Sequence, residues 1–244
     1  MIVKNRLLDL DSVIYQDDDL FKFSLDSVLL SKFVTIHMRT KKIIDLATGN
    51  APIPMFLSYR CNVPIYGIEY QRYIYDMAVR SINENSLDHQ IHLLCGDVKN
   101  IDQYFDSESF DVVVCNPPYF KINSDLKFLN DNKIKAMARH EVSLSLDDVV
   151  KAAAFLLKKG GNFAMIHRTE RLVEIFDVFR KYHIEPKRIQ FIYPKVGMDS
   201  DLFLIEGIKN GKLGLKMLYP IIVHKDNGDY TDEMSELLNF NDLR

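Results

Sequence analysis

The chain has 244 residues, a formal net charge of −3, 47% hydrophobic residues and 27% charged residues. This length and composition fit a single domain with a large core, and we expect one domain over residues 1–244. Without an overall positive charge, binding of nucleic acid would have to use local patches of lysine and arginine. The sequence has no run of roughly 20 apolar residues and no signal-peptide core, so we expect a cytoplasmic protein without membrane contact.

The cysteine pattern argues against disulfides and metal sites. Cys61, Cys95 and Cys115 are an odd number of cysteines, and none stands in a spacing typical of zinc ligands. We therefore expect free thiols in a reducing compartment and no bound metal.

The elements follow in chain order after a preamble of about 40 residues. Residues 21–34 have the apolar spacing of an amphipathic helix from about Ser24 or Leu25, with Ser24 as a candidate N-cap. A further helix is expected to start near Pro52 or Pro54. Beyond these, strands are predicted at 42–46, 65–69, 91–95, 112–115 and 162–167, and helices at 72–85, 145–159 and 169–182. Because strands alternate with helices, we predict an α/β fold of the Rossmann-like, doubly wound type with a mostly parallel sheet.

The C-terminal part is predicted to contain strands outside the alternating strand–helix pattern. Residues 186–193 and 201–207 alternate as two antiparallel strands at the sheet edge, and 215–224 predicts a last strand broken by Pro220. A short helix is expected over 231–238. The single domain is thus divided into a preamble (1–40), a catalytic α/β core (41–207) and a C-terminal hairpin and helix (208–244).

A strand over 112–115 ends in the sequence NPPYF. Two prolines stop the strand and hold the next residues in a rigid turn, and the carboxyl ends of parallel strands are where ligands bind. The Asn116 side-chain oxygen and the Pro117 carbonyl can accept hydrogen bonds from a planar exocyclic amine and stabilise the positive charge that develops during its methylation. Tyr119, with Phe120, offers a stacking face for a base taken out of its helix. The alternative is an ordinary loop with Tyr119 packed in the core.

Asn116-Pro117-Pro118-Tyr119 resembles the motif of the amino-methyltransferases that use S-adenosylmethionine on exocyclic nitrogens. Together with segments 45–51, 139–141 and 167–172, it makes the chain similar to the bacterial tRNA adenine-N6 methyltransferases that modify the adenosine beside the anticodon of valine tRNA. The resemblance implies the seven-stranded methyltransferase fold, S-adenosylmethionine as cofactor, tRNA as partner and an N6-methylated adenosine as product. We expect a monomer or a weak homodimer.

Acidic residues at successive strand ends form the predicted cofactor site. Glu69 ends a strand about 20 residues after the glycine turn, a spacing that places a carboxylate on ribose hydroxyls. Asp97 can accept a hydrogen bond from the adenine amino group, and Asp45 would face the methionine end of the cofactor. Each of these acids has a plain alternative as a turn or surface residue, and alanine replaces the usual glycine at positions 47 and 51. The predicted cofactor-binding residues are Asp45, Ala47, Gly49, Glu69, Asp97, Val98 and Asn116.

The predicted substrate contacts come from later segments. Residues 121–139 have no clean periodicity and carry several lysines, which indicates a lid that orders on RNA or, alternatively, a plain disordered surface loop. Arg168 and Arg171 follow a strand end, where they can contact phosphate or pair with Glu170 or Glu174. The predicted catalytic residues are Asn116, Pro117 and Tyr119. The predicted substrate-binding residues are Pro118, Phe120, Lys121, Arg139, His140, Arg168 and Arg171.

Other functions fit parts of this pattern. Enzymes with the same motif resemble one another in acting on planar amines, so the N2 amine of guanine and the glutamine amide of a release factor remain alternatives. The release-factor enzymes carry a sizeable helical domain ahead of the glycine turn, whereas only about forty residues precede it here. A non-catalytic RNA-binding module is a third alternative, supported by the alanines in the turn.

Overall fold

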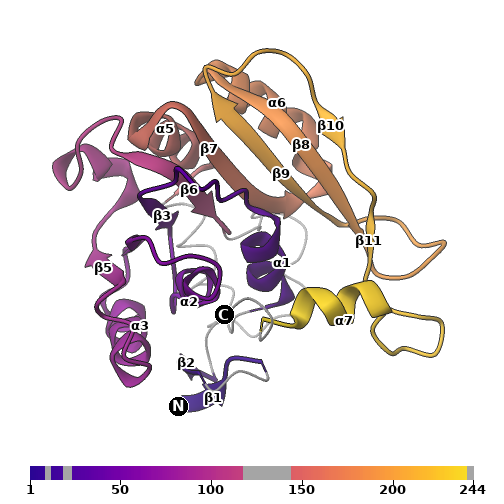
Figure 1. The fold of residues 1–244 in the computed structure, drawn as a ribbon, viewed down its shortest axis with the longest axis horizontal. Coiled ribbons are helices and arrows are strands. Elements are labelled where there is room, and N and C mark those ends of the chain that lie inside the picture. Colours follow the sequence, from indigo (N-terminus) through magenta and orange to yellow (C-terminus); the bar gives the residue numbers. More distant parts are fainter. Residues whose placement is uncertain (9–11, 19–23, 118–143, 241–244) are drawn as a thin grey trace.

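The computed structural model describes residues 1–8, 12–18, 24–117 and 144–240. A nine-stranded sheet forms its centre (Figure 1). The strands of this sheet are β3 (Ile43–Leu46), β4 (Ile65–Glu69), β5 (Ile91–Cys95), β6 (Phe110–Cys115), β7 (Leu157–Arg168), β8 (Ile184–Tyr193), β9 (Leu202–Lys209), β10 (Lys216–Met217) and β11 (Ile221–Ile222). The helices are α1 (Leu25–Phe33), α2 (Pro52–Ser58), α3 (Arg72–Glu84), α5 (Leu146–Leu156), α6 (Leu172–Lys181) and α7 (Asp232–Leu238), with 3₁₀ helices η1 (Val98–Gln103) and η3 (Thr169–Arg171).

Seven strands form the body of the sheet, in the order β8-β9-β7-β6-β3-β4-β5. All of its strand pairs are parallel except those of β9, which runs antiparallel to both β7 and β8. From β3 the chain builds outward through β4 and β5, then returns to the other side of β3 with β6 and β7, so the topological switch point lies between β3 and β6. The prediction of a doubly wound, mostly parallel, seven-stranded fold is therefore confirmed.

Helices cover both faces of the sheet (Figure 1). Helices α1, α2, α3 and α7 pack on one face, and α5, α6 and η1 pack on the other. Strand residues alternate between the two cores, as Val112 and Val114 face the first while Val113 and Cys115 face the second. Burial on both faces explains the continuous apolar runs that marked these strands in the sequence. Among the described residues, no helix is long and apolar enough to cross a membrane.

The helix predicted over 145–159 starts as expected but ends early. Ser145 and Asp148 form a complete capping box. The helix stops at Leu156, and β7 begins at Leu157, which pairs with Phe110 of β6. Residues 157–159, which the local sequence favoured as helix, thus belong to strand β7. The glycines at 160–161 lie inside this strand rather than after the helix.

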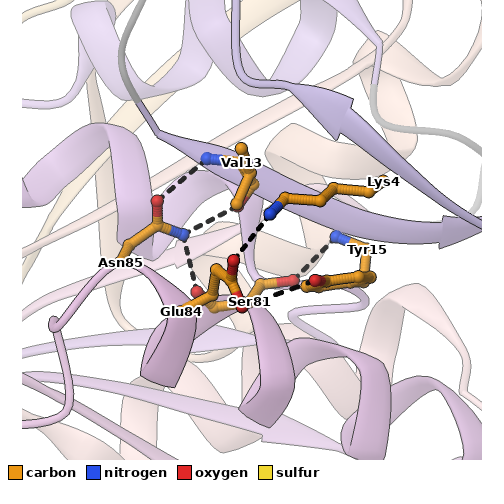
Figure 2. Close-up of polar contacts among 6 residues, drawn as sticks. All are labelled: Lys4, Val13, Tyr15, Ser81, Glu84 and Asn85. Carbon is orange, nitrogen blue, oxygen red and sulfur yellow. Dashed lines mark hydrogen bonds and ion pairs between the residues drawn. The ribbon is translucent and has the colours of Figure 1, made fainter.

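The preamble contains an antiparallel hairpin that the sequence reading missed. Strands β1 (Ile2–Arg6) and β2 (Val13–Asp17) pair with each other, and β2 lies against α3. Asn85 binds the Val13 backbone on both sides, accepting from its N–H at 2.9 Å and donating to its carbonyl at 2.7 Å (Figure 2). Ser81 accepts a hydrogen bond from the Tyr15 N–H. Side chains of α3 therefore satisfy the edge of β2 in place of a third strand.

The predicted strands at 186–193 and 201–207 form as β8 and β9 and are antiparallel, but they do not both lie at the edge. Strand β9 is inserted between β7 and β8, and β8 is followed outward by β10 and β11. These two short strands pair in parallel with β8 on either side of Pro220. The predicted C-terminal hairpin is reduced to one antiparallel bridge between His224 and Tyr230, because residues 216–217 and 221–222 pair with β8 instead.

Helix α1 is anchored to the sheet by a buried ionic network. Glu206 of β9 accepts hydrogen bonds from the Thr35 N–H at 2.7 Å and the Thr35 hydroxyl at 2.8 Å. Arg188 of β8 donates to Glu206 at 3.1 Å and to the Phe33 carbonyl at 2.6 Å. The last turn of the preamble helix is thereby fixed against strands more than 150 residues later in the chain.

Candidate active site at the carboxyl edge of the sheet

The predicted cofactor-site residues lie at the carboxyl ends of four neighbouring strands, in the order β6, β3, β4 and β5. Leu46, the last residue of β3, pairs with Ile68 of β4 on one side and with Cys115 of β6 on the other. Asn116 follows Cys115 directly, so it leaves the sheet beside the turn over residues 47–51. Both segments flank the switch point, where doubly wound sheets bind their ligands.

The turn after β3 uses three residues in the left-handed region. Ala47, Gly49 and Ala51 have φ values of 54°, 58° and 62°. This conformation is free for glycine but costs an alanine about 1–2 kcal/mol, which explains why glycine is usual at these positions. The turn is held by hydrogen bonds from the Thr48 N–H to the Ile68 carbonyl and from the Ala51 N–H to the Thr48 carbonyl. The alanines therefore keep the glycine-type turn at the cost of backbone strain.

Asp45 is a buried acid, and one of its oxygens has no partner in the described part of the chain. Its side chain is 1% exposed, and Oδ2 accepts a hydrogen bond from the Thr48 hydroxyl at 2.6 Å. Within the described residues, its buried Oδ1 makes no hydrogen bond. Burial, followed by repulsion from Glu69, raises the pKa of Asp45 from 3.8 to about 8. A buried acceptor of this kind is costly in the free protein and is suited to a positively charged partner.

Glu69 ties two turns of the carboxyl edge together. It is 3% exposed, its Oε2 accepts from the Gly49 N–H at 3.0 Å, and its Oε1 accepts from the Gln71 N–H at 2.9 Å. Each carboxylate oxygen can accept a second hydrogen bond. The predicted ribose contact is thus compatible with this geometry, while the turn-stabilising role is directly visible in it.

Asp97 caps the 3₁₀ helix that follows β5. Its Oδ1 accepts from the Lys99 N–H at 2.9 Å, and its Oδ2 lies 3.8 Å from the Lys99 ammonium. Val98, the first residue of η1, is buried. Asp97 therefore stabilises the turn after β5, which is the alternative role expected from the sequence. Its contact with the adenine of a cofactor remains a prediction.

Asn116 is half-buried and Pro117 is buried at the end of β6. Burial raises the pKa of the neighbouring Cys115 thiol well above its usual value, so this cysteine is an inert core residue. The other predicted residues of the target pocket lie outside the described residues: Pro118, Tyr119, Phe120, Lys121, Arg139 and His140.

The two arginines predicted to contact phosphate differ. Arg171 donates two hydrogen bonds to Glu174, at 2.8 and 2.6 Å, which favours intramolecular pairing. Arg168 is half-buried at the end of β7, and phosphate contact remains a prediction for it. His167, just before it, is 1% exposed and accepts from the Arg168 N–H through Nδ1. Burial and the charge of Arg171 lower the pKa of His167 to about 4, so this imidazole is neutral near pH 7.

The family model described as Eco57I restriction-modification methylase matches residues 64–198, more than half of the chain. The chain belongs to this methylase family. The matched range runs from β4 through the motif after β6 to the loop between β8 and β9. It includes Glu69, Asp97, Asn116 and most of the other predicted site residues, whereas Asp45, Ala47 and Gly49 precede it.

Curated relatives extend over most of the chain. A tRNA1(Val) (adenine(37)-N6)-methyltransferase of Cytophaga hutchinsonii is 25% identical over 180 residues, which is 74% of each chain. A protein of the same name from Bacteroides thetaiotaomicron is 26% identical over 229 residues, covering 92% of this chain and 91% of its own. The resemblance found in the sequence motifs is thus confirmed.

Solved structures confirm the fold. A predicted O-methyltransferase from Agrobacterium tumefaciens has a TM-score of 0.72 and 22% identity, and the match covers 88% of this chain and 96% of that one. Geranyl diphosphate C-methyltransferase from Streptomyces coelicolor, solved with S-adenosyl-L-homocysteine, has a TM-score of 0.56 and 12% identity over 75% and 76% of the two chains. At these identities the likeness concerns the fold alone.

Proposed function

We propose that this protein transfers a methyl group from S-adenosylmethionine to the exocyclic N6 amine of an adenosine in tRNA, beside the anticodon. The observation that carries this proposal is the pairing of Leu46 with Cys115. It places the strained turn of residues 47–51, with its buried acid Asp45, next to Asn116 and Pro117. This neighbourhood supports a cofactor site and a motif suited to planar amines on one edge of the sheet. The names of the curated relatives support the choice of tRNA and of adenine N6.

The residues at this edge fit S-adenosylmethionine. The unpartnered Oδ1 of Asp45 is an acceptor for the α-ammonium group of its methionine part. A Cβ atom at Gly49 would meet no other atom within 4 Å, so the turn is open there. Glu69 would hold the ribose hydroxyls, and Asp97 with the Val98 N–H would hold the adenine. Bound there, the cofactor supplies an electrophilic methyl group on its sulfonium.

The protein's part in the transfer is to orient the amine. The lone pair of an aromatic amine is delocalised into the ring, so the amine is a poor nucleophile. The Asn116 side-chain oxygen and the Pro117 carbonyl would accept hydrogen bonds from the two N–H groups of this amine. These contacts would favour its pyramidal geometry and stabilise the positive charge that develops on it. Tyr119 would stack on the adenine after it leaves its helix. The methylated amine can lose its proton to water, so His140 need not act as a base.

Recognition of the RNA would come from local contacts, since the net charge is −3. Arg168, with Lys121 and Arg139, is proposed for phosphate contact. A tRNA substrate would place the enzyme in the cytoplasm. We expect it to be a monomer or a weak homodimer. No metal is required for direct transfer between sulfonium and amine.

The test is transfer of isotopically labelled methyl from S-adenosylmethionine into unmodified tRNA, followed by digestion to nucleosides. Label in N6-methyladenosine is the expected result, and single valine tRNA transcripts with and without the adenosine beside the anticodon would locate the site. Label in N2-methylguanosine would keep the cofactor and overturn the base. Cofactor binding without label in RNA would point to a protein amide, and a protein that does not bind the cofactor would be an RNA-binding module.

A further inference from the structure

Two buried polar atoms have no hydrogen-bond partner in the part of the chain that the structure describes: Gln16 Nε2 and Asp45 Oδ1. Both side chains are 1% exposed. One atom is a donor and the other is an acceptor. Leaving such a group unpaired inside a protein costs about 1–3 kcal/mol, so a fold that leaves two unpaired is suited to a ligand that pairs with both.

Gln16 lies close to the turn that holds Asp45. The Asn50 side chain donates to the carbonyl of Tyr15 at 2.9 Å, so β2 is held against the end of the turn at the peptide preceding Gln16. Asp45 is bound to the same turn through Thr48. The same turn is therefore bound by β2 at the residue before Gln16 and by β3 through the Asp45 side chain itself.

The side chain of Gln16 points toward the body of the protein. Residues alternate in a strand, so Gln16 shares a face with Ile14, which is completely buried in the core with α1 and α2. Tyr15 faces the other way, toward Glu84 of α3 (Figure 2). The Gln16 Oε1 accepts from Asn5 at 3.3 Å, which fixes the amide so that Nε2 is the free end.

We propose that Gln16 is a cofactor-positioning residue whose Nε2 donates to the α-carboxylate of S-adenosylmethionine, while Asp45 Oδ1 accepts from its α-ammonium group. This inference rests on the proposed function. A free α-amino acid is the only part of the cofactor that offers a strong acceptor and a charged donor on adjacent atoms, and this is the complement of the two unpaired atoms. The N-terminal hairpin thereby becomes part of the cofactor site rather than a covering element.

The experiment compares three ligands by calorimetry, without RNA so that no turnover occurs. S-adenosylmethionine carries both charged groups, its decarboxylated form keeps only the ammonium group, and 5′-methylthioadenosine has neither. Gln16→Met should weaken S-adenosylmethionine about 10- to 100-fold, the range of a hydrogen bond to a charged group, and should change the other two ligands less than about 3-fold. Asp45→Asn should weaken binding of S-adenosylmethionine and of its decarboxylated form, and should leave binding of 5′-methylthioadenosine unchanged.

Gln90→Met is the matched control. Gln90 is also buried at 8% exposure, but its Nε2 already donates to the carbonyls of Cys61 and Val63. Its loss should lower the melting temperature and leave the ratio of affinities for the three ligands unchanged.

Equal weakening of all three ligands by Gln16→Met, or no weakening, would overturn the role of Gln16 while leaving the proposed function intact. If the variant does not fold, the unaltered protein decides the question. A preference of at least about 10-fold for S-adenosylmethionine over its decarboxylated form supports the carboxylate contact, and equal affinity overturns it. If the unaltered protein binds none of the ligands, the proposed function fails and this inference fails with it.

Discussion

Two buried carboxylates, Glu206 and Asp45, lie in opposite chemical situations. Glu206 is 3% exposed and accepts hydrogen bonds from the Thr35 N–H, the Thr35 hydroxyl and the Arg188 guanidinium. Asp45 is 1% exposed and accepts a hydrogen bond from the Thr48 hydroxyl, and its other oxygen has no partner among the residues that the structure describes. The first joins helix α1 to strands β8 and β9. The second stands at the topological switch point.

The difference separates a charge that holds the fold from a charge kept for a ligand. A buried carboxylate whose oxygens are paired holds neighbouring elements together, whereas burial of an acid without a positive partner raises its pKa. The expected result is that loss of Glu206 destabilises the fold, whereas changes at and near Asp45 do not destabilise it, and loss of Asp45 or Asn116 lowers binding or activity. Substitutions at Glu206, Asn116, Asp45, Ala47 and Ala51 test this division.

The largest effect is expected for Glu206→Ala. The substitution leaves the Arg188 guanidinium and the Thr35 N–H without their buried acceptor. Removal of one partner of a buried ion pair costs about 3–5 kcal/mol. Urea denaturation should show this loss in the free energy of unfolding. Glu233→Ala, at an exposed position of α7, is the control and should change it by less than about 0.5 kcal/mol. A loss below about 1 kcal/mol at Glu206 would remove the distinction between the two acids.

Asn116→Ala should affect turnover rather than stability. Loss of a preorganised acceptor for the developing charge is expected to lower turnover by about 100-fold or more, with cofactor affinity changed little. Single-turnover methylation of tRNA measures the first quantity and calorimetry the second. Asn83→Ala, at an exposed position of α3, is the matched control. Near-normal turnover in the Asn116 variant would contradict its proposed role.

Asp45→Asn should stabilise the free protein near pH 7 by roughly 1–3 kcal/mol while weakening the cofactor. The pKa of Asp45 is about 8 in the folded protein and 3.8 when unfolded. Between these values the folded state holds a proton that the unfolded state has released, so stability falls as the pH rises. Asparagine does not ionise and avoids this cost, although its new N–H group lacks a partner.

The pH dependence provides the control for that variant. In the unaltered protein, Asp45 should lower the free energy of unfolding by about 1.4 kcal/mol for each pH unit between about 4 and 8. The difference in free energy of unfolding between the Asp45→Asn variant and the unaltered protein should therefore be largest near pH 8 and should vanish toward pH 4. Denaturation curves at pH 5, 6, 7 and 8 measure it, and parallel curves would show that Asp45 is ionised in the fold.

The smallest effect is expected in the turn itself. Ala47 and Ala51 are both left-handed, but Ala47 is half-buried whereas Ala51 is completely buried. Ala47→Gly should relieve strain and raise the free energy of unfolding by about 0.5 kcal/mol, after subtraction of the greater freedom of the unfolded chain. Ala51→Gly should gain nothing, because it also loses a buried methyl group. Thermal melting of the two variants tests this, and equal gains would contradict it.

The sequence was most informative where signals are local. The strands at 65–69 and 91–95 form with their predicted bounds, and Ser145 and Asp148 build the predicted capping box. These features depend on residues within one element. The helix over 145–159 was too long because Leu157 pairs with Phe110 of β6 and begins a strand, a contact between segments that are far apart in the sequence.

The candidate site shows the same division. Asp45, Glu69 and Asn116 could be selected from their positions after apolar runs, because parallel strands end at one edge of the sheet. Gln16 could not, since it carries no motif and its hairpin was missed. The alternation Ile14-Tyr15-Gln16 was its only local signal, and an exposed edge strand has the same pattern.

By itself, the sequence determined the doubly wound fold, the order of its strand ends and the residue types placed there, because hydrophobic period and turn chemistry are written in neighbouring residues. The tertiary structure alone decided that β9 is inserted beside β7, that β2 is held by Asn85 and Asn50, and that Asp45 keeps an unpartnered oxygen while Glu206 does not. These outcomes depend on which distant groups meet after burial. Whether a buried polar atom is paired is a property of the assembled fold and not of any segment.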